Sequence, residues 1–269
     1  MFDVHDRPAE SADASSCLTL ERPAPAADGM EARIQRHAEA LAPLSPAERL
    51  RYVREVLAGH IVFTHGFGIE GQVILHWICE QGLDIDLVTI DTGRLFPETY
   101  ELWGDTERRY GRRIRAIYPN QQGLEELVAR DGIDGFFLSK DARTACCDVR
   151  KVRPLDRTLA GAEAWITGAR GDQTDVRREA GLIGFEESRG LIKFSPLFDW
   201  TREQVLAFVA EHRVPINPLH AKGFASIGCA PCTRALTPGE PERNGRWWWE
   251  EGGHRECGLH LPRQPYSNI

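Results

Sequence analysis

The sequence predicts an α/β protein with a mostly parallel sheet, helices on both faces and a mobile C-terminal segment. Short apolar runs alternate with helical segments between residues 30 and 212 of the 269-residue chain, which is the order of a parallel sheet with crossover helices. Loops rich in Gly and polar residues follow three of these runs, where such sheets bind ligands. Gly252-Gly253 supplies a hinge for the stretch beyond this pattern.

Four apolar runs have the length and composition of short buried strands. We expect these strands at residues 61–64, 85–90, 114–118 and 164–167. Loops 65–71, 91–97 and 168–178 leave the carboxyl ends of the first, second and fourth runs. Because parallel strands end at one edge of their sheet, we expect these three loops to share a cleft.

Two capping boxes mark the starts of helices, since each places Ser or Thr three residues before Glu or Gln. Ser45-Pro-Ala-Glu48 begins a helix that we expect Gly59 to end. Thr201-Arg-Glu-Gln204 begins a helix that runs to about His212. We expect further helices from about residue 30, from residue 72 to about residue 81, and from about residue 98.

The chain divides into three expected parts. Residues 1–30 are rich in Ala, Asp, Ser and Pro and predict a flexible tail without a core. Residues 31–240 contain the alternating pattern and form the α/β domain. Residues 241–269 form the C-terminal segment.

Composition excludes several classes of protein. A net charge of −7 argues against broad nucleic-acid binding, which needs a basic surface. No apolar stretch reaches the roughly 18 residues of a membrane span, and the N-terminus lacks the pattern of a secretory signal. Seven cysteines without such a signal predict a reducing, cytoplasmic location in which clustered thiols bind metal or act in catalysis.

The loop His65-Gly-Phe-Gly-Ile-Glu-Gly71 lies between an expected strand and an expected helix. Its backbone N–H groups, together with the helix dipole, suit a phosphate group. The Gly-Lys-Ser/Thr ending of a Walker loop is absent, and so is the Ser-Gly-Gly-x-Asp-Ser run of ATP pyrophosphatases. A tight connection without a ligand is the alternative.

Two close pairs of cysteines dominate the chemistry of the chain: Cys146-Cys147 and Cys229-x-x-Cys232. Four thiolates suit an iron–sulfur cluster or zinc. Adjacent ligands are awkward for one zinc ion, whereas neighbouring thiolates can bind different irons of a cubane cluster, so we favour [4Fe–4S] over zinc or no metal. Cys257, outside both pairs and near basic residues, has the setting of a reactive thiol.

Six separated motifs resemble those of one family. They occupy residues 91–99, 146–151, 167–173, 227–233, 245–250 and 256–260. The most specific are Cys146-Cys147-Asp-Val-Arg-Lys151, Ile227-Gly-Cys-Ala-Pro-Cys-Thr233, Gly245-Arg-Trp-Trp-Trp-Glu250 and Glu256-Cys-Gly-Leu-His260. With these motifs the chain resembles the bacterial, thioredoxin-dependent adenylyl-sulfate reductases of sulfate assimilation, within the wider phosphoadenylyl-sulfate reductase family.

The resemblance implies a fold like that of the adenine nucleotide α-hydrolases and a reduction of adenosine 5′-phosphosulfate to sulfite and AMP. Residues 31–240 would bind the nucleotide and hold a [4Fe–4S] cluster on the two cysteine pairs. Cys257 in segment 241–269 would attack the sulfuryl group and form a thiosulfonate, which thioredoxin would release. The implied substrate-binding residues are Gly66, Phe67, Gly68, Lys151, Gly168, Arg177, Arg178, Arg243, Arg246 and His260.

The chain departs from the family pattern at Gly66, which stands where a serine is common. The arginine after Asp172-Gln173 could be Arg177 or Arg178. Since no thioredoxin-like domain follows His260, we expect an external reductant. A homo-oligomer is left open.

Three rival functions remain at this point. A reductase for 3′-phosphoadenylyl sulfate is the nearest, although such enzymes usually lack the two cysteine pairs. A tRNA-thiolating iron–sulfur enzyme would need an adenylating loop and a basic surface, which the sequence lacks. A zinc-stabilised binding module is the non-enzymatic rival.

Overall fold

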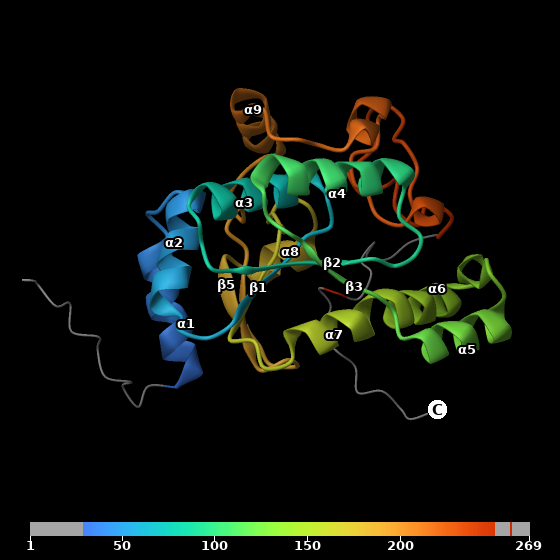
Figure 1. The fold of residues 1–269 in the computed structure, drawn as a ribbon, viewed down its shortest axis with the longest axis horizontal. Helices are drawn as coiled ribbons and strands as arrows, with labels where there is room; N and C mark the ends of the chain where they lie inside the picture. Colours follow the sequence, from blue (N-terminus) through green and yellow to red (C-terminus); the bar gives the residue numbers. More distant parts are fainter. Residues whose placement is uncertain (1–28, 251–258, 260–269) are drawn as a thin grey trace, which may run out of the picture.

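The computed structural model describes residues 29–250 and residue 259. Its centre is a six-stranded sheet with the order β3-β2-β1-β4-β6-β5 (Figure 1). All neighbouring strands are parallel except β5, which runs antiparallel to β6. The strands are β1 (Ile61–Thr64), β2 (Asp86–Ile90), β3 (Arg115–Ile117), β4 (Ala164–Ile166), β5 (Ile183–Glu186) and β6 (Leu191–Phe194).

The prediction of a mostly parallel sheet is confirmed, and the four expected strands are β1 to β4. The hairpin of β5 and β6 was not expected. The polar or small residues Gly184 in β5 and Lys193 in β6 interrupt the apolar runs by which the other strands were predicted. Gly190, with φ of 65°, lies in the turn between them, a conformation that glycine adopts without strain.

Helices surround the sheet. Those of the first half are α1 (Met30–Leu41), α2 (Pro46–Val56), α3 (Ile69–Glu80), α4 (Pro97–Tyr110) and α5 (Gln121–Asp131). Those of the second half are α6 (Lys140–Cys147), α7 (Arg153–Leu159), α8 (Asp175–Ala180) and α9 (Arg202–His212). Short helical turns are η1 (Gly135–Phe137), η2 (Asp148–Val152), η3 (Pro218–Lys222) and η4 (Ala230–Cys232).

Both expected capping boxes are present, at the starts of α2 and α9. Two expected boundaries were wrong. Helix α2 ends at Val56, ahead of Gly59, because Leu57 already has an extended backbone. Helix α3 begins at Ile69 rather than residue 72, because the extended residue Gly68 caps it. The glycine loop is therefore shorter than expected, and Gly71 lies inside the first turn of α3.

Alternate residues of the strands enter two apolar clusters, one on each face of the sheet. Phe63 of β1 packs in the cluster that includes residues of α2, α3, α4 and α9, whereas Val62 packs in the cluster that includes Leu155 and Leu159 of α7. Figure 1 shows α3 and α4 on one side of the sheet and α7 on the other. The prediction of helices on both faces is thus confirmed. Within the described chain, every helix is too short or too polar to cross a bilayer.

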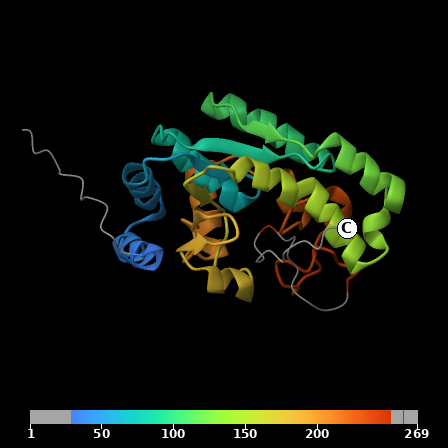
Figure 2. The same ribbon diagram turned by 90° about the horizontal axis from the view of Figure 1, so that it is seen from below.

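Helix α6, turn η2 and helix α7 follow one another directly and were not expected as helices. Figure 2 shows their yellow-green end close to the red C-terminal part of the chain. This run carries Cys146, Cys147 and Lys151. It thereby brings the first cysteine pair to the second, in which Cys229 precedes η4 and Cys232 is its last residue.

Candidate active site

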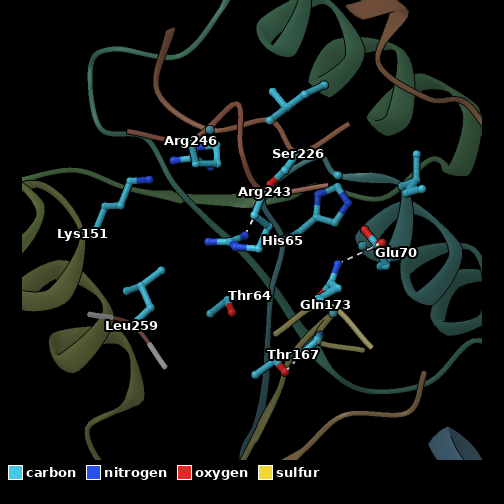
Figure 3. A pocket seen from close by; sticks show the side chains of 18 of the residues that line it. Thr64, His65, Glu70, Lys151, Thr167, Gln173, Ser226, Arg243, Arg246 and Leu259 are labelled. Atoms are coloured by element: carbon cyan, nitrogen blue, oxygen red, sulfur yellow. Dashed lines mark hydrogen bonds between the residues drawn. The ribbon is translucent and has the colours of Figure 1, made fainter. Parts of the chain in front are cut away.

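A cleft of about 240 Å³ lies at the carboxyl ends of β1, β2 and β4 (Figure 3). The three loops that were expected to share a cleft all line it, through residues such as Gly66, Thr92 and Gly168. Segments 225–228 and 242–247 complete its wall. The position is the one at which open parallel sheets bind ligands.

The glycine loop contributes Gly66 and Gly68 to the cleft, but it turns Phe67 away. Phe67 has φ of 58° and is 1% exposed, and its ring lies 5.7 Å from that of Trp103. The structure thus places the Phe67 side chain in the core and leaves the flanking glycines at the surface of the cleft. First-turn N–H groups of α3 lack partners within the helix, and Gly68 leaves this end without a side-chain cap.

Gly71 and Gly168 allow close packing behind the loop. A Cβ at Gly71 would lie 2.8 Å from Cδ2 of His65, and a Cβ at Gly168 would lie 3.4 Å from the backbone N of Gly71. His65 itself lines the cleft and is 2% exposed. Burial lowers the pKa of its imidazole to about 3, so the ring is neutral at pH 7.

Four of the expected cationic residues line the cleft: Lys151, Arg177, Arg243 and Arg246. Arg178 instead forms an ion pair with Asp175, 3.1 Å between Nη1 and Oδ1, and its side chain is 66% exposed. Of the two arginines that the sequence could not separate, the structure places Arg177 in the cleft.

Arg243 and Arg246 stand three positions apart, a spacing that would put both on one face of a helix if their segment were helical. Their segment forms turns instead, and the backbone N–H of Arg246 donates to the carbonyl of Arg243 at 3.0 Å. Nη1 of Arg243 lies 3.4 Å from Oγ of Ser226, and Nε of Arg246 donates to the carbonyl of Cys232 at 3.3 Å. The tight turn brings both guanidinium groups to the cleft without a helix.

The two cysteine pairs converge on a second, small and enclosed cavity. This cavity is lined by all four cysteines of the two pairs, together with Phe136 and Pro231. Cys147, Cys229 and Cys232 are each less than 9% exposed, and Trp247 packs in the same cluster. The fold thus brings together two cysteine pairs that 81 residues separate in the sequence.

Positive side chains surround the four thiols. Arg94, Arg143, Arg150 and Lys151 line the cysteine cavity, and Nη1 of Arg150 donates to the carbonyl of Thr92 at 2.6 Å. Burial raises the pKa of the Cys232 thiol to about 11, with the neighbouring Cys229 adding to the effect. A buried set of thiols ringed by cations suits the binding of a group that needs thiolate ligands. Among the described residues, no three His, Cys, Asp or Glu side chains are arranged to hold a single metal ion.

Cys257 and His260 lie outside the described residues, as do the Gly252-Gly253 hinge and the tail at residues 1–28. Leu259 is described, lines the cleft and packs against the cluster that contains Val62 and Leu155. Because Cys257 precedes Leu259 by two residues, the covalent chain keeps their Cα atoms within about 7 Å.

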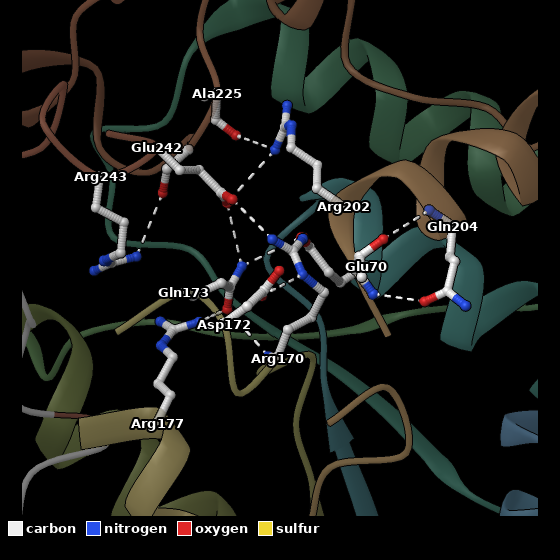
Figure 4. Close-up of polar contacts among 12 residues, drawn as sticks. Glu70, Arg170, Asp172, Gln173, Arg177, Arg202, Gln204, Ala225, Glu242 and Arg243 are labelled. Atoms are coloured by element: carbon white, nitrogen blue, oxygen red, sulfur yellow. Dashed lines mark hydrogen bonds and ion pairs between the residues drawn. The ribbon is translucent and has the colours of Figure 1, made fainter. Parts of the chain in front are cut away.

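An ionic network in the wall of the cleft was missed from the sequence (Figure 4). Arg170, 1% exposed, pairs with Glu70 and with Glu242, the latter at 2.8 Å. In the sequence, Arg170 was marked only by its place in the motif at residues 167–173, and no role was assigned to it. His65 was also missed, although it begins the glycine loop.

A parallel sheet with a cationic cleft at its carboxyl edge defines an α/β protein that is built to bind an anionic ligand. Residues 60–235 match the family model described as phosphoadenosine phosphosulfate reductase domain. The chain belongs to this family.

Individual relatives agree with this assignment. The chain is 51% identical over 221 residues to adenosine 5′-phosphosulfate reductase of Agrobacterium fabrum (strain C58), which covers 82% of this chain and 85% of the relative. It is 49% identical to the protein of the same name from Allochromatium vinosum, with coverage of 77% and 83%. A solved structure, phosphoadenylyl-sulfate reductase from Candida auris in complex with phosphate, matches with a TM-score of 0.67 at 30% identity, covering 77% of this chain and 98% of that one.

Proposed function

We propose that this chain reduces adenosine 5′-phosphosulfate to sulfite and AMP in sulfate assimilation, with thioredoxin as the external reductant. The single observation that carries the proposal is the position of Lys151, which lines both the cleft and the cysteine cavity. An anion in the cleft is therefore next to the buried thiols. The names of the relatives supply the substrate class.

In this proposal the nucleotide is held at the glycine loop and the phosphosulfate at the cations. Backbone groups at Gly66, Gly68 and Gly168 line the cleft without side chains in the way. Lys151, Arg177, Arg243 and Arg246 supply positive charge for the anionic oxygens, and charge-assisted hydrogen bonds of this kind are the strong ones. The uncharged thiol Cys79, on α3, has no part in it.

A [4Fe–4S] cluster on Cys146, Cys147, Cys229 and Cys232 is part of the proposal. The fit rests on four cysteines around one cavity, three of them buried, and on the cations beside them. A single zinc ion needs its ligands about 2.0–2.3 Å away, whereas a cubane cluster is wider and offers a separate iron to each thiolate. When bound, the cluster would supply fixed negative charge that orients Lys151 and the nearby arginines toward the sulfate end of the substrate.

The reaction proper is assigned to Cys257. Its thiolate attacks the sulfur of the sulfuryl group, the S–O bond to the phosphate breaks, and AMP leaves with the bonding electron pair. A thiosulfonate then remains on Cys257. A thiolate of reduced thioredoxin attacks the Cys257 sulfur and releases sulfite, and the second thioredoxin thiol resolves the mixed disulfide.

The position of Leu259 supports the assignment, because this residue lines the cleft two positions after Cys257. Its apolar side chain packs on residues of the sheet and α7. Leu259 therefore lies at the cleft, and in this proposal Cys257, two positions earlier in the chain, reaches the sulfuryl group of a bound substrate. A cytoplasmic location belongs to the proposal as well, since thiols stay reduced there.

The test is to incubate anaerobically purified protein with adenosine 5′-phosphosulfate, without reductant, and to measure its intact mass and peptide masses. We expect one sulfonate on the peptide that contains Cys257 and release of sulfite when reduced thioredoxin is added. Cys257→Ser should form no adduct, whereas the control Cys79→Ser should form it normally. An adduct on another peptide, or an unmodified wild-type protein, would contradict the proposal.

Two further measurements separate the rival functions. Comparing kcat/KM for adenosine 5′-phosphosulfate and its 3′-phosphorylated form should show a preference for the former, as the names of the relatives suggest. Iron and acid-labile sulfide, with broad visible absorption near ~400 nm, should be present. Zinc in their place would favour the binding module.

A further inference from the structure

The buried guanidinium of Arg170 joins three parts of the cleft wall (Figure 4). Its Nη1 pairs with Glu70 in the first turn of α3. Its Nε lies 2.9 Å from Oδ1 of Asp172 in its own loop, and its Nη2 lies 2.8 Å from Oε2 of Glu242. Because the Arg170 side chain is 1% exposed and those of Glu70 and Glu242 are 11% and 18% exposed, these two ion pairs are shielded from solvent more than surface pairs are.

The carboxylate of Glu242 contacts other side chains as well. Besides Arg170, its Oε1 accepts from Nε2 of Gln173 at 3.3 Å and lies 3.5 Å from Nη1 of Arg202. Gln173 also donates to Oε1 of Glu70 at 3.2 Å. The carboxylate of Glu242 is therefore fixed from two sides, by the loop after β4 and by the start of α9.

Glu242 directly precedes Arg243, which lines the cleft. The far end of the same short segment is fixed as well, since the backbone N–H of Trp247 donates to the carbonyl of Cys232 at 3.2 Å. Segment 242–247 is thus held at one end by the ionic network and at the other by the cysteine cluster. Between these two points it carries Arg243 and Arg246, two of the three arginines that line the cleft.

We propose that Glu242, held by Arg170, is a positioning residue that fixes Arg243 at the sulfuryl end of the bound substrate. This inference rests on the proposed function. Without the carboxylate, the segment keeps its anchor at Cys232 but loses the one beside Arg243. Arg243 then samples positions in which it does not meet the anion, so substrate binding weakens.

The experiment measures the dissociation constant of adenosine 5′-phosphosulfate in a Cys257→Ser background, which removes the proposed covalent step. Glu242→Gln should weaken binding about tenfold, because a neutral amide replaces a charge-assisted contact. Arg243→Ala should weaken it at least as much. The double variant should bind no worse than Arg243→Ala, since residues that act through one another are not additive.

Glu240→Gln is the matched control. Glu240 lies two positions earlier and pairs with Arg234 at 2.7 Å, outside the residues that line the cleft, so its loss should leave the dissociation constant unchanged. Glu242→Asp keeps the charge on a shorter side chain and should bind between wild type and Glu242→Gln. If Glu242→Gln does not fold, Glu242→Asp combined with Arg243→Ala provides the same test of additivity.

Fully additive effects of Glu242→Gln and Arg243→Ala, or wild-type binding by Glu242→Gln, would overturn the positioning role. The proposed function is judged separately, from sulfite formation by protein that retains Cys257. If sulfite forms normally but the two binding effects are additive, only the positioning role of Glu242 is wrong. If the protein forms no sulfite but the two binding effects are non-additive, the proposed reaction is wrong and the positioning role of Glu242 stands.

Discussion

Lys151 lies between the cleft and the buried thiol of Cys229. Burial alone would raise the pKa of this thiol, but the Lys151 ammonium, the Thr92 hydroxyl and Arg246 together lower it below its ordinary value. Lys151 also lines the cleft. One cation therefore serves two anionic partners, the thiol set on one side and any ligand of the cleft on the other.

Replacing Lys151 should impair the reaction without emptying the cysteine site. A charge-assisted hydrogen bond contributes about 1.5–3 kcal/mol, so we expect Lys151→Ala to lower kcat/KM for adenosine 5′-phosphosulfate by about 10- to 100-fold. Iron content should stay near wild type, because none of the proposed ligands changes. Lys140→Ala, at the exposed start of α6, is the control and should have wild-type kinetics.

The four clustered thiols should behave as one unit. Changing any of Cys146, Cys147, Cys229 or Cys232 to Ser should lower bound iron and sulfite formation together, because each thiol lines the same cavity. Cys79→Ser should alter neither, since Cys79 lies on α3 outside that cavity. The measurements are iron analysis, the visible spectrum and a sulfite assay. A variant that lacks iron yet reduces substrate at the normal rate would refute the electrostatic role proposed for the cluster.

Features encoded locally could be predicted from the sequence. The strand Ile61–Thr64 matches its apolar run residue for residue, and the capping box at Ser45 forms as expected. The shared cleft followed from the rule that parallel strands end at one edge of the sheet. The meeting of the cysteine pairs followed from the chemistry of thiolates, with no local signal needed.

Features that depend on tertiary contacts could not be predicted. Arg170 meets Glu70 across 100 residues of sequence and Glu242 across 72, and no spacing rule links such positions. Phe67 lies between two cleft glycines in the sequence, but its positive φ turns the side chain into the core. There its ring contacts those of His65 and Trp103, and the composition of the loop gives no sign of these contacts.

His65 should make the protein sensitive to acid. Its ring lies among Phe63, Phe67 and Gly71, and neither ring nitrogen has a hydrogen-bond partner among the described residues. Burial lowers its pKa from 6.5 to about 3. Between these two values the unfolded chain binds a proton that the folded protein does not, so acid favours unfolding.

We therefore expect the free energy of unfolding to be unaffected by this group above pH 7 and to fall by up to about 1.4 kcal/mol per pH unit below pH 6.5. Urea unfolding at several pH values measures the slope. His65→Gln should reduce the slope by this contribution, whereas His60→Gln, at a half-exposed position, controls for the loss of an imidazole. An unchanged slope in His65→Gln would show that other groups cause the acid sensitivity.

Gly228, directly before Cys229, should be required for the position of Arg246. A Cβ at this residue would overlap the Arg246 guanidinium, which is 5% exposed and lines the cleft. The overlapping atoms are the end of a flexible side chain, so the backbone need not move. We expect Gly228→Ala to raise KM about tenfold through displacement of Arg246, a loss of about 1.4 kcal/mol in binding, while iron content stays near wild type.

Gly245→Ala separates this effect from general crowding. A Cβ at Gly245 would meet the backbone carbonyl oxygen of Arg234, which cannot swing away, so the segment itself must shift. Overpacking of this kind costs about 1–3 kcal/mol of stability, and we expect a lower melting temperature for Gly245→Ala than for Gly228→Ala. Because the change at Gly228 acts directly on the Arg246 side chain, its effect on KM should depend on Arg246. In an Arg246→Ala background, Gly228→Ala should raise KM no further. An equal rise in both backgrounds would mean that Gly228 acts through the cysteine site or the backbone instead.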